Sequence, residues 1–149
     1  SMTHGGVNRF DGKVFTQYLI KDGLSDSQVR TIYCDKSGKI WMGFNGNRKS
    51  GLTVYDGNTF KTSSLKDGLC NPRIRTIYED KNGKLWLGAN LGNLCIFDGH
   101  HFTEFNHKGQ SFSDVLFIIG DLEGNIWFGG PQGLWKYDGK TVIDMASKE

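Results

Sequence analysis

The sequence predicts an all-β protein, a β-propeller segment of about three and a half blades, each with four antiparallel strands. Three observations predict this fold. Asp-Gly pairs begin at positions 11, 56, 98 and 138, which places them 45, 42 and 40 residues apart. The motif Asp-x-x-Gly-x-(Ile/Leu)-Trp-x-Gly occurs three times, with its tryptophan at 41, 86 and 127. Short apolar runs lie between turn signals and show no stripe of period 3.6, so little helix is expected.

Each complete repeat is expected to hold four strands, named a to d in chain order. In the first repeat they are Val29–Asp35, Ile40–Phe44, Leu52–Tyr55 and Phe60–Ser63, because these runs are rich in β-branched and aromatic residues. Strand a recurs at Ile74–Asp80 and Val115–Asp121, strand b holds the tryptophan, and strands c and d flank each Asp-Gly turn. Strand d is the most polar, with Lys61, Thr62, Glu104 and Asn106, which is typical of an outer edge that faces water.

The chain is expected to begin with half a blade, a strand c at Gly6–Phe10 and a strand d at Val14–Tyr18. This half blade spans residues 5–20, and full blades span 26–63, 71–106 and 113–146, while residues 1–4 are read as a cloning remnant or disordered N-terminus. The prediction is thus 14 strands. Because propellers typically close with roughly 4–8 blades, the ring must be completed by further sequence or by oligomerisation. A homodimer is the favoured partner arrangement.

The repeated aspartates and tryptophans are predicted to be structural. Each aspartate stands three residues before a glycine, which is typical of a turn in which the carboxylate bonds to nearby backbone N–H groups. The turn-forming pairs are Asp35 with Gly38, Asp80 with Gly83, and Asp121 with Gly124. A large aromatic side chain at one strand position in every blade is expected to fill the gap between blades rather than to stack on a sugar. These residues are Trp41, Trp86 and Trp127, and Trp135 is expected to pack as well.

Composition excludes several functions. Lys plus Arg is 18 and Asp plus Glu is 16, so the net charge is +2, which argues against a nucleic-acid binder. No apolar run has the roughly 20 residues of a membrane helix, and no signal peptide stands at the start. The adjacent His100 and His101 point to opposite strand faces, so no metal site or other cofactor is expected. The cysteines show no C-x-x-C spacing, and Cys34 and Cys70 are interpreted as chance changes at variable positions.

The repeat resembles the two-component regulator propeller family. The matching pieces are Asp80–Gly88, Gly51–Gly57, and the Asp-Gly-Leu loops that begin at Asp22 and Asp67. The resemblance extends from about Gly5 to Met145, except that Lys108–Ser113 replaces the Asp-Gly-Leu loop of the third repeat. It implies an extracytoplasmic or periplasmic β-propeller that acts as a dimeric sensor region of a hybrid two-component kinase and detects carbohydrate breakdown products.

The resulting hypothesis is a non-enzymatic sensor that binds a carbohydrate-derived or other polar small molecule. One alternative is a structural or protein-interaction propeller that assembles as a homo-oligomer. A second is a propeller lyase or hydrolase, although no catalytic motif is found in the sequence.

A ligand is expected where the loops that precede strand a and follow strand b gather, because loops on a rigid scaffold often carry function. Guanidinium groups there would hold carboxylates or sulfates, or would instead pair with neighbours such as Asp26. The candidate ligand-binding residues are Arg30, Arg73, Arg75, Asn45, Asn47 and Arg48.

Overall fold

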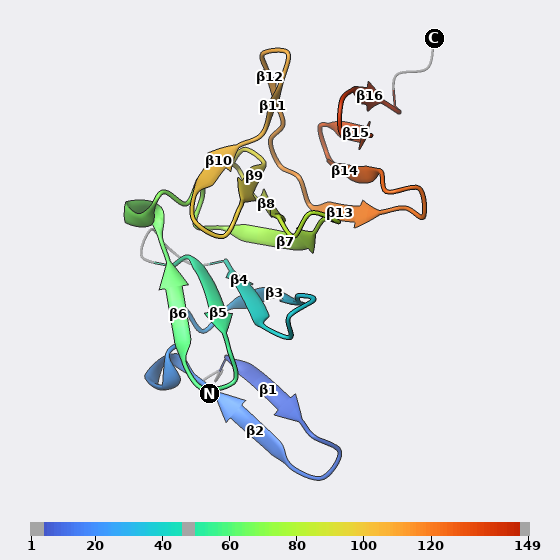
Figure 1. Cartoon of the computed structure of the whole chain (residues 1–149). Coiled ribbons are helices and arrows are strands. Elements are labelled where there is room, and N and C mark those ends of the chain that lie inside the picture. The colour runs from blue at the N-terminus through green and yellow to red at the C-terminus, as the bar shows by residue number, and fades with distance from the viewer. Residues whose placement is uncertain (1–4, 46–49, 147–149) are drawn as a thin grey trace.

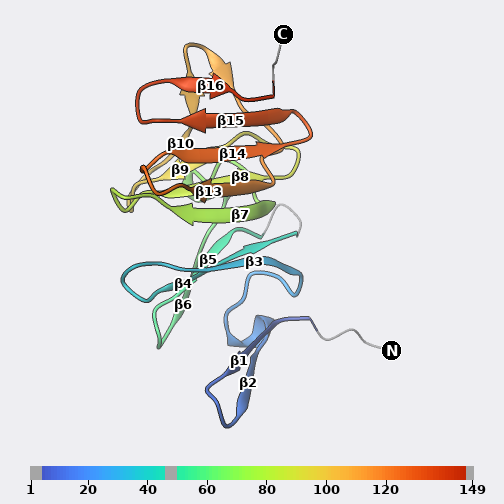
Figure 2. The same ribbon diagram turned by 90° about the vertical axis from the view of Figure 1, so that its right-hand side faces the viewer.

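The computed structural model describes residues 5–45 and 50–146 and is all-β apart from two 3₁₀ turns, at Ile20–Asp22 and Leu65–Asp67. Three four-stranded antiparallel sheets follow a two-stranded one, in chain order along an open arc (Figures 1 and 2). The half blade is β1 (Val7–Phe10) and β2 (Phe15–Tyr18). Blade 1 is β3 (Val29–Cys34), β4 (Ile40–Phe44), β5 (Leu52–Tyr55) and β6 (Phe60–Ser63). Blade 2 is β7 (Ile74–Glu79), β8 (Leu85–Ala89), β9 (Cys95–Phe97) and β10 (Phe102–Glu104). Blade 3 is β13 (Phe117–Gly120), β14 (Ile126–Gly130), β15 (Gly133–Tyr137) and β16 (Val142–Asp144).

The predicted fold class is therefore confirmed: every full blade is a meander in which each strand pairs with the next. Because the strands alternate in direction, the a–b and c–d turns lie at one end of a blade, and the b–c and d–a loops lie at the other. The half blade and blade 3 are at opposite ends of the arc (Figures 1 and 2).

The Asp-x-x-Gly motif folds as a tight a–b turn. In blade 2, one oxygen of the Asp80 carboxylate accepts the backbone N–H groups of Asn82 and Lys84 at 2.8 and 3.0 Å. Gly83 has a φ of 80°, which L side chains rarely adopt. The second carboxylate oxygen accepts the Trp86 indole N–H at 2.9 Å. The same indole–carboxylate bond joins Trp41 to Asp35 and Trp127 to Asp121, so the motif fixes the indole as well as the turn.

Blades pack on each other through these indoles. The Trp86 ring is 2% exposed, and its centroid lies 5.7 Å from that of Tyr137 in blade 3. The Trp41 ring lies 5.8 Å from that of Phe97 in blade 2. Two glycines allow this close approach, because a Cβ on Gly43 would collide with Ile74 and one on Gly88 would collide with the carbonyl oxygen of Val115. The three apolar cores thus lie between successive blades rather than within them.

One hairpin was absent from the sequence prediction. The described residues contain sixteen strands rather than fourteen, because β11 (Asn106–His107) and β12 (Gln110–Ser111) form a separate sheet. Asn106 therefore belongs to this hairpin, and its assignment to strand d was wrong. Lys108 and Gly109 both have positive φ, 52° and 80°, which is the geometry of a type I′ hairpin turn. The hairpin replaces the Asp-Gly-Leu loop between blades 2 and 3 and projects beyond the sheets (Figure 1).

No helix within the described ranges is long and apolar enough to cross a bilayer.

Candidate functional site

The d–a loops are built by a repeated hydrogen-bond pattern. Before blade 1, the Asp22 carboxylate accepts the Leu19 N–H, and before blade 2 the Asp67 carboxylate accepts the Ser64 N–H. Each 3₁₀ turn ends on a glycine at positive φ, and the next residue, Leu24 or Leu69, is buried as an anchor. The loops are therefore held in a fixed shape at this end of the blades.

A disulfide joins Cys70 in the loop before β7 to Cys95 in β9, with a Cα–Cα distance of 6.0 Å. The interpretation of Cys70 as a chance change is thus wrong. Cys95 is buried, so the bond ties the d–a loop to the middle of blade 2. Cys34 is exposed and free.

Two residues near this disulfide adopt backbone conformations that side chains disfavour. Leu91 has a φ of 56° and Asp114 has a φ of 53°. They are joined directly, because the Leu91 N–H donates to the Asp114 carboxylate at 2.6 Å. Leu91 follows strand b of blade 2, whereas Asp114 precedes strand a of blade 3, so the contact bridges two blades. Non-glycine residues at positive φ cluster at functional sites more often than elsewhere.

Two shallow pockets lie on either side of Leu91, with volumes of about 440 and 320 Å³. Both are lined by Cys70, Asn71 and Leu91. The larger adds the acidic side chains of Glu104 and Asp114, and the smaller adds Arg73 and Asn90. We name this surface the loop rim and define it by Asn71, Arg73, Asn90, Leu91, Glu104 and Asp114. It offers hydrogen-bond acceptors on one side and a guanidinium group on the other.

The loop rim includes only one of the predicted ligand-binding residues, Arg73. Its backbone is fixed from two sides: the Arg73 N–H donates to the Asn71 side chain at 2.8 Å, and its carbonyl accepts the Asn90 N–H at 3.0 Å. Among the described residues, no salt bridge involves Arg73. Asn71, Leu91 and Asp114 were not predicted, although Asn71 stands at the position of Asp26 in the preceding repeat and forms the same side-chain turn.

The other arginines share a different feature. Arg30 and Arg75 each occupy a β-bulge, because the pairing register shifts between Val29 and Thr31 and between Ile74 and Thr76. Neither lines the two rim pockets. The alternative pairing with Asp26 is not formed, because the described part of the chain shows no ion pair of Arg30 or Arg75. The Asp26 carboxylate instead accepts the Gln28 N–H.

The remaining predicted residues belong to the b–c loop of blade 1. Asn45 is half-buried, and its N–H donates to the Gln28 carbonyl at 3.1 Å. Asn47 and Arg48 lie outside the described residues.

Each motif aspartate uses one carboxylate oxygen to accept turn N–H groups and the other to accept the indole N–H of its motif tryptophan. Hydrogen bonds from the Trp127 indole, the Asn125 side chain and nearby backbone N–H groups hold the pKa of Asp121 well below its usual range. A carboxylate of this kind is a poor proton donor near neutral pH. Within residues 5–45 and 50–146, no group of three His, Cys, Asp or Glu side chains is placed to hold a metal ion.

The fold is that of a β-propeller segment, and its loop rim is a polar surface at the junction of blades 2 and 3. Residues 23–46 and 68–90 match the sequence model of the family described as two component regulator propeller. These ranges contain strands a and b of blades 1 and 2 and the Gly-Leu part of the loop before each. Two segments of the chain therefore match the repeat of that family, and the resemblance drawn from its motifs is confirmed.

Solved structures support the same fold. A crystal structure of the extracellular domain of the putative one component system BT4673 from B. thetaiotaomicron matches with a TM-score of 0.74 and 24% identity, over 96% of this chain and 22% of that one. A second, described as the extracellular domain of the putative hybrid two component system BT4673, matches with a TM-score of 0.70 and 23% identity, over 95% and 22%. The extracellular domain of the putative hybrid two component system BT3049 from the same organism gives 0.61 and 20%, over 97% and 24%. This chain thus spans less than a quarter of the solved domains it matches.

No curated protein matches the chain.

Proposed function

We propose that the chain is a non-enzymatic sensor module of a two-component signalling protein, and that it binds an acidic, carbohydrate-derived small molecule at the loop rim. The observation that carries this proposal is the placement of Arg73. Its side chain is exposed, forms no salt bridge with a described carboxylate, and borders a pocket shared with two amides, Asn71 and Asn90.

The chemistry of the rim suits such a ligand. A guanidinium group presents its donors in a fork that matches a carboxylate or sulfate. Across Leu91, Glu104 and Asp114 supply acceptors for sugar hydroxyls. The disulfide and the Leu91–Asp114 hydrogen bond fix the loops, so little conformational entropy is lost when a ligand binds.

We expect Arg73→Ala to abolish binding of an acidic disaccharide while leaving the fold intact, because the side chain is exposed. The measurement is thermal shift and calorimetry with a uronic-acid disaccharide and its neutral counterpart. At a ligand concentration 100-fold above Kd, the wild type should gain about 2.7 kcal/mol of stability. Arg73→Lys should retain the charge but bind more weakly, since it loses the forked geometry.

Lys140→Ala is the matched control, because it removes an exposed positive charge from the c–d turn at the opposite end of a blade. Equal binding by Arg73→Ala and the wild type would contradict the assignment to the rim. The absence of a shift at millimolar ligand would contradict the proposed ligand class.

An extracytoplasmic location belongs to the same proposal. The solved structures that match are described as extracellular domains. The Cys70–Cys95 bond is also of the kind that persists in oxidising compartments.

A second candidate function is assembly as a homo-oligomer, and the two end faces favour it. On blade 3, Ile119 and Leu122 are largely exposed, whereas the corresponding residues of blade 2, Tyr78 and Lys81, are placed against blade 3. At the other end, the rings of Phe10 and Phe15 are stacked with their centroids 4.6 Å apart, and both side chains are exposed. Phe97 and Phe102 form the equivalent stacked pair in blade 2, where Trp41 of blade 1 packs against Phe97. Trp127 of one copy is thus suited to the Phe10–Phe15 pair of another.

We expect sedimentation to show a concentration-dependent dimer that Leu122→Glu shifts to monomer. A charge on this fully exposed side chain cannot be buried in an interface without a large cost. Ile20→Glu, at an exposed residue of the first 3₁₀ turn, is the control and should leave the dimer unchanged. A wild type that remains monomeric at high concentration would contradict self-association through these faces.

A further inference from the structure

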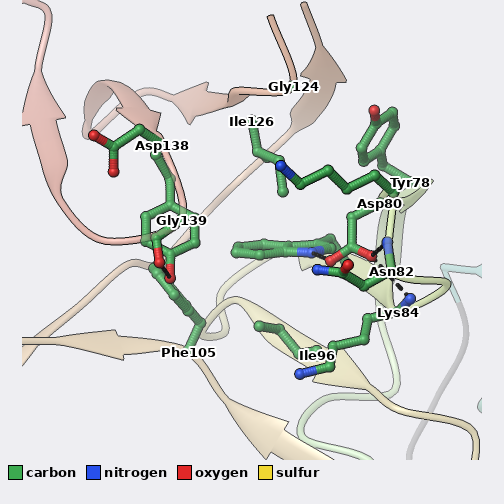
Figure 3. Close-up of a pocket in the computed structure, with 13 residues that line it drawn as sticks. Tyr78, Asp80, Asn82, Lys84, Ile96, Phe105, Gly124, Ile126, Asp138 and Gly139 are labelled. Carbon is green, nitrogen blue, oxygen red and sulfur yellow. Dashed lines mark hydrogen bonds between the residues drawn. The ribbon is translucent and has the colours of Figure 1, made fainter.

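A cavity lies between blades 2 and 3 at the end of the a–b and c–d turns, opposite the loop rim. Its volume is about 290 Å³, close to the lower limit of roughly 300 Å³ for small-molecule sites. Figure 3 shows Asn82 and Lys84 on one side of this cavity and Phe105 on the other. Both blades that form its walls have all four strands, so the cavity belongs to a complete junction.

The inner wall of the cavity is apolar and largely aromatic. The Phe105 ring centroid lies 4.9 Å from that of Trp86 and 5.1 Å from that of Tyr137. The Tyr137 hydroxyl donates to the Gly139 carbonyl at 2.9 Å, which fixes this ring against the c–d turn. Such a wall favours a planar apolar group about the size of one ring. Its apolar side chains are those of Trp86, Ile96, Phe105, Ile126 and Tyr137.

The a–b turn of blade 2 supplies the polar side of the cavity. Lys81, Asn82 and Lys84 all line it, and all three side chains are exposed. The turn itself is rigid, because the Asp80 carboxylate accepts the backbone N–H groups of Asn82 and Lys84. Two ammonium groups and one amide are therefore presented from a fixed backbone, and each can donate to a ligand oxygen.

Lys81 lacks the acidic partner that the equivalent lysine of blade 1 has. The Lys36 ammonium group donates to the Asp80 carbonyl at 3.2 Å and lies 4.0 Å from the Glu79 carboxylate. Blade 3 has Gly120 at the position of Glu79, so this corner of the next junction holds no carboxylate. Among the described residues, neither Lys81 nor Lys84 forms a salt bridge. Two cations thus border the cavity without a counter-ion.

The two carboxylates that also line the cavity are engaged in turns. Asp80 accepts two turn N–H groups and the Trp86 indole N–H. Asp138 accepts the N–H groups of Lys140 and Thr141 at 2.8 and 2.7 Å. Because these donors stabilise both negative charges in place, the carboxylates do not serve as counter-ions for the two lysines. A ligand anion would fill that role.

We propose that this cavity is a second small-molecule site and that it binds a small aromatic carboxylate. The ring of the ligand lies against the wall formed by Phe105 and Tyr137, and its carboxylate accepts from the ammonium groups of Lys81 and Lys84. The site is at the opposite end of the blades from the loop rim and does not depend on the proposed sugar-acid ligand.

The test is calorimetric titration of the 149-residue chain with phenylacetate. Phenylacetamide and acetate are the matched probes, because the first lacks the charge and the second lacks the ring. We expect saturable one-to-one binding of phenylacetate. Both probes should bind at least about tenfold more weakly, since hydrogen bonds to an ionised group are the stronger ones and the aromatic wall needs a ring to contact.

Two double variants locate the site. Lys81→Gln with Lys84→Gln removes both ammonium groups and should weaken phenylacetate binding at least about tenfold. Lys13→Gln with Lys39→Gln removes the same amount of charge from two exposed lysines that do not line the cavity, and it should leave affinity unchanged. The Tm of each free variant checks that it remains folded.

Four results would overturn the proposal. They are no saturable binding at millimolar phenylacetate, equal affinity for phenylacetate and phenylacetamide, equal affinity for phenylacetate and acetate, and equal affinity of the wild type and the Lys81, Lys84 double variant.

Arg73→Ala distinguishes this site from the loop rim. We expect it to bind phenylacetate as the wild type does, and a loss of binding would assign the aromatic carboxylate to the rim instead. The Lys81, Lys84 double variant should in turn bind the uronic-acid disaccharide with unchanged affinity. The two proposals therefore fail separately.

Discussion

Replacing Trp86 with alanine is expected to lower the free energy of unfolding by about 3–5 kcal/mol. The side chain is 2% exposed and touches three aromatic rings, so its removal leaves a cavity at the junction of blades 2 and 3. It also removes the donor to the buried Asp80 carboxylate. Because a domain is typically stable by about 5–15 kcal/mol, much of the protein should unfold at moderate denaturant. Chemical denaturation monitored by circular dichroism measures the change.

Trp127→Ala is the matched control, because it deletes the same side chain at the same position of the repeat. Trp127 is only half-buried, and the described residues place no further blade against it, so the loss should be less than half as large. Trp86→Phe separates packing from hydrogen bonding, since it keeps an aromatic ring and removes the indole N–H. Equal losses for Trp86→Ala and Trp127→Ala would show that the indoles stabilise their own blades rather than the junctions.

The fold could be predicted because its signals are local and repeated. An Asp-Gly pair fixes a c–d turn, and the Asp-x-x-Gly segment fixes an a–b turn, whatever surrounds them. The indole–carboxylate bond was within reach as well, since aspartate and tryptophan are six residues apart in all three copies. This bond was not predicted, because the carboxylate was interpreted only as an acceptor of backbone N–H groups.

The features that break the repeat could not be predicted in the same way. Cys70 and Cys95 occupy non-equivalent positions of one blade, and no other repeat contains such a pair. The hairpin β11–β12 has strands of only two residues, so an alternating apolar pattern cannot arise. Only Gly109 of its turn carried a signal, because glycine adopts positive φ readily whereas Lys108 before it does not.

The loop rim was only partly predictable for a related reason. Arg30 and Arg75 occur at equal positions, which suggested a shared role, yet that position is a bulge in each blade and not a pocket wall. The rim instead depends on Leu91 and Asp114, two residues from different repeats that meet only because blades 2 and 3 are adjacent. A surface formed at a blade junction depends on tertiary structure, which a repeat pattern does not report.

Removing the disulfide is expected to lower the free energy of unfolding by about 3 kcal/mol. In the double variant Cys70→Ala, Cys95→Ala, the unfolded chain is no longer restricted by a cross-link between residues 25 positions apart. Loop-closure entropy for a loop of this length gives about 3 kcal/mol. Denaturation of the wild type with and without dithiothreitol should show the same loss, and reductant should leave the double variant unchanged. Cys34→Ala, at the exposed free thiol, is the control and should change stability by less than about 0.5 kcal/mol.

The same variant tests whether the disulfide supports recognition, because Cys70 lines both pockets of the loop rim. Without the cross-link, the loop before β7 should sample more conformations, so binding of the acidic disaccharide must pay a larger ordering cost. We therefore expect the double variant to bind more weakly even at temperatures where it is fully folded. A variant with lower stability but unchanged affinity would show that the bond stabilises blade 2 alone and that the rim is positioned by the contact between Leu91 and Asp114.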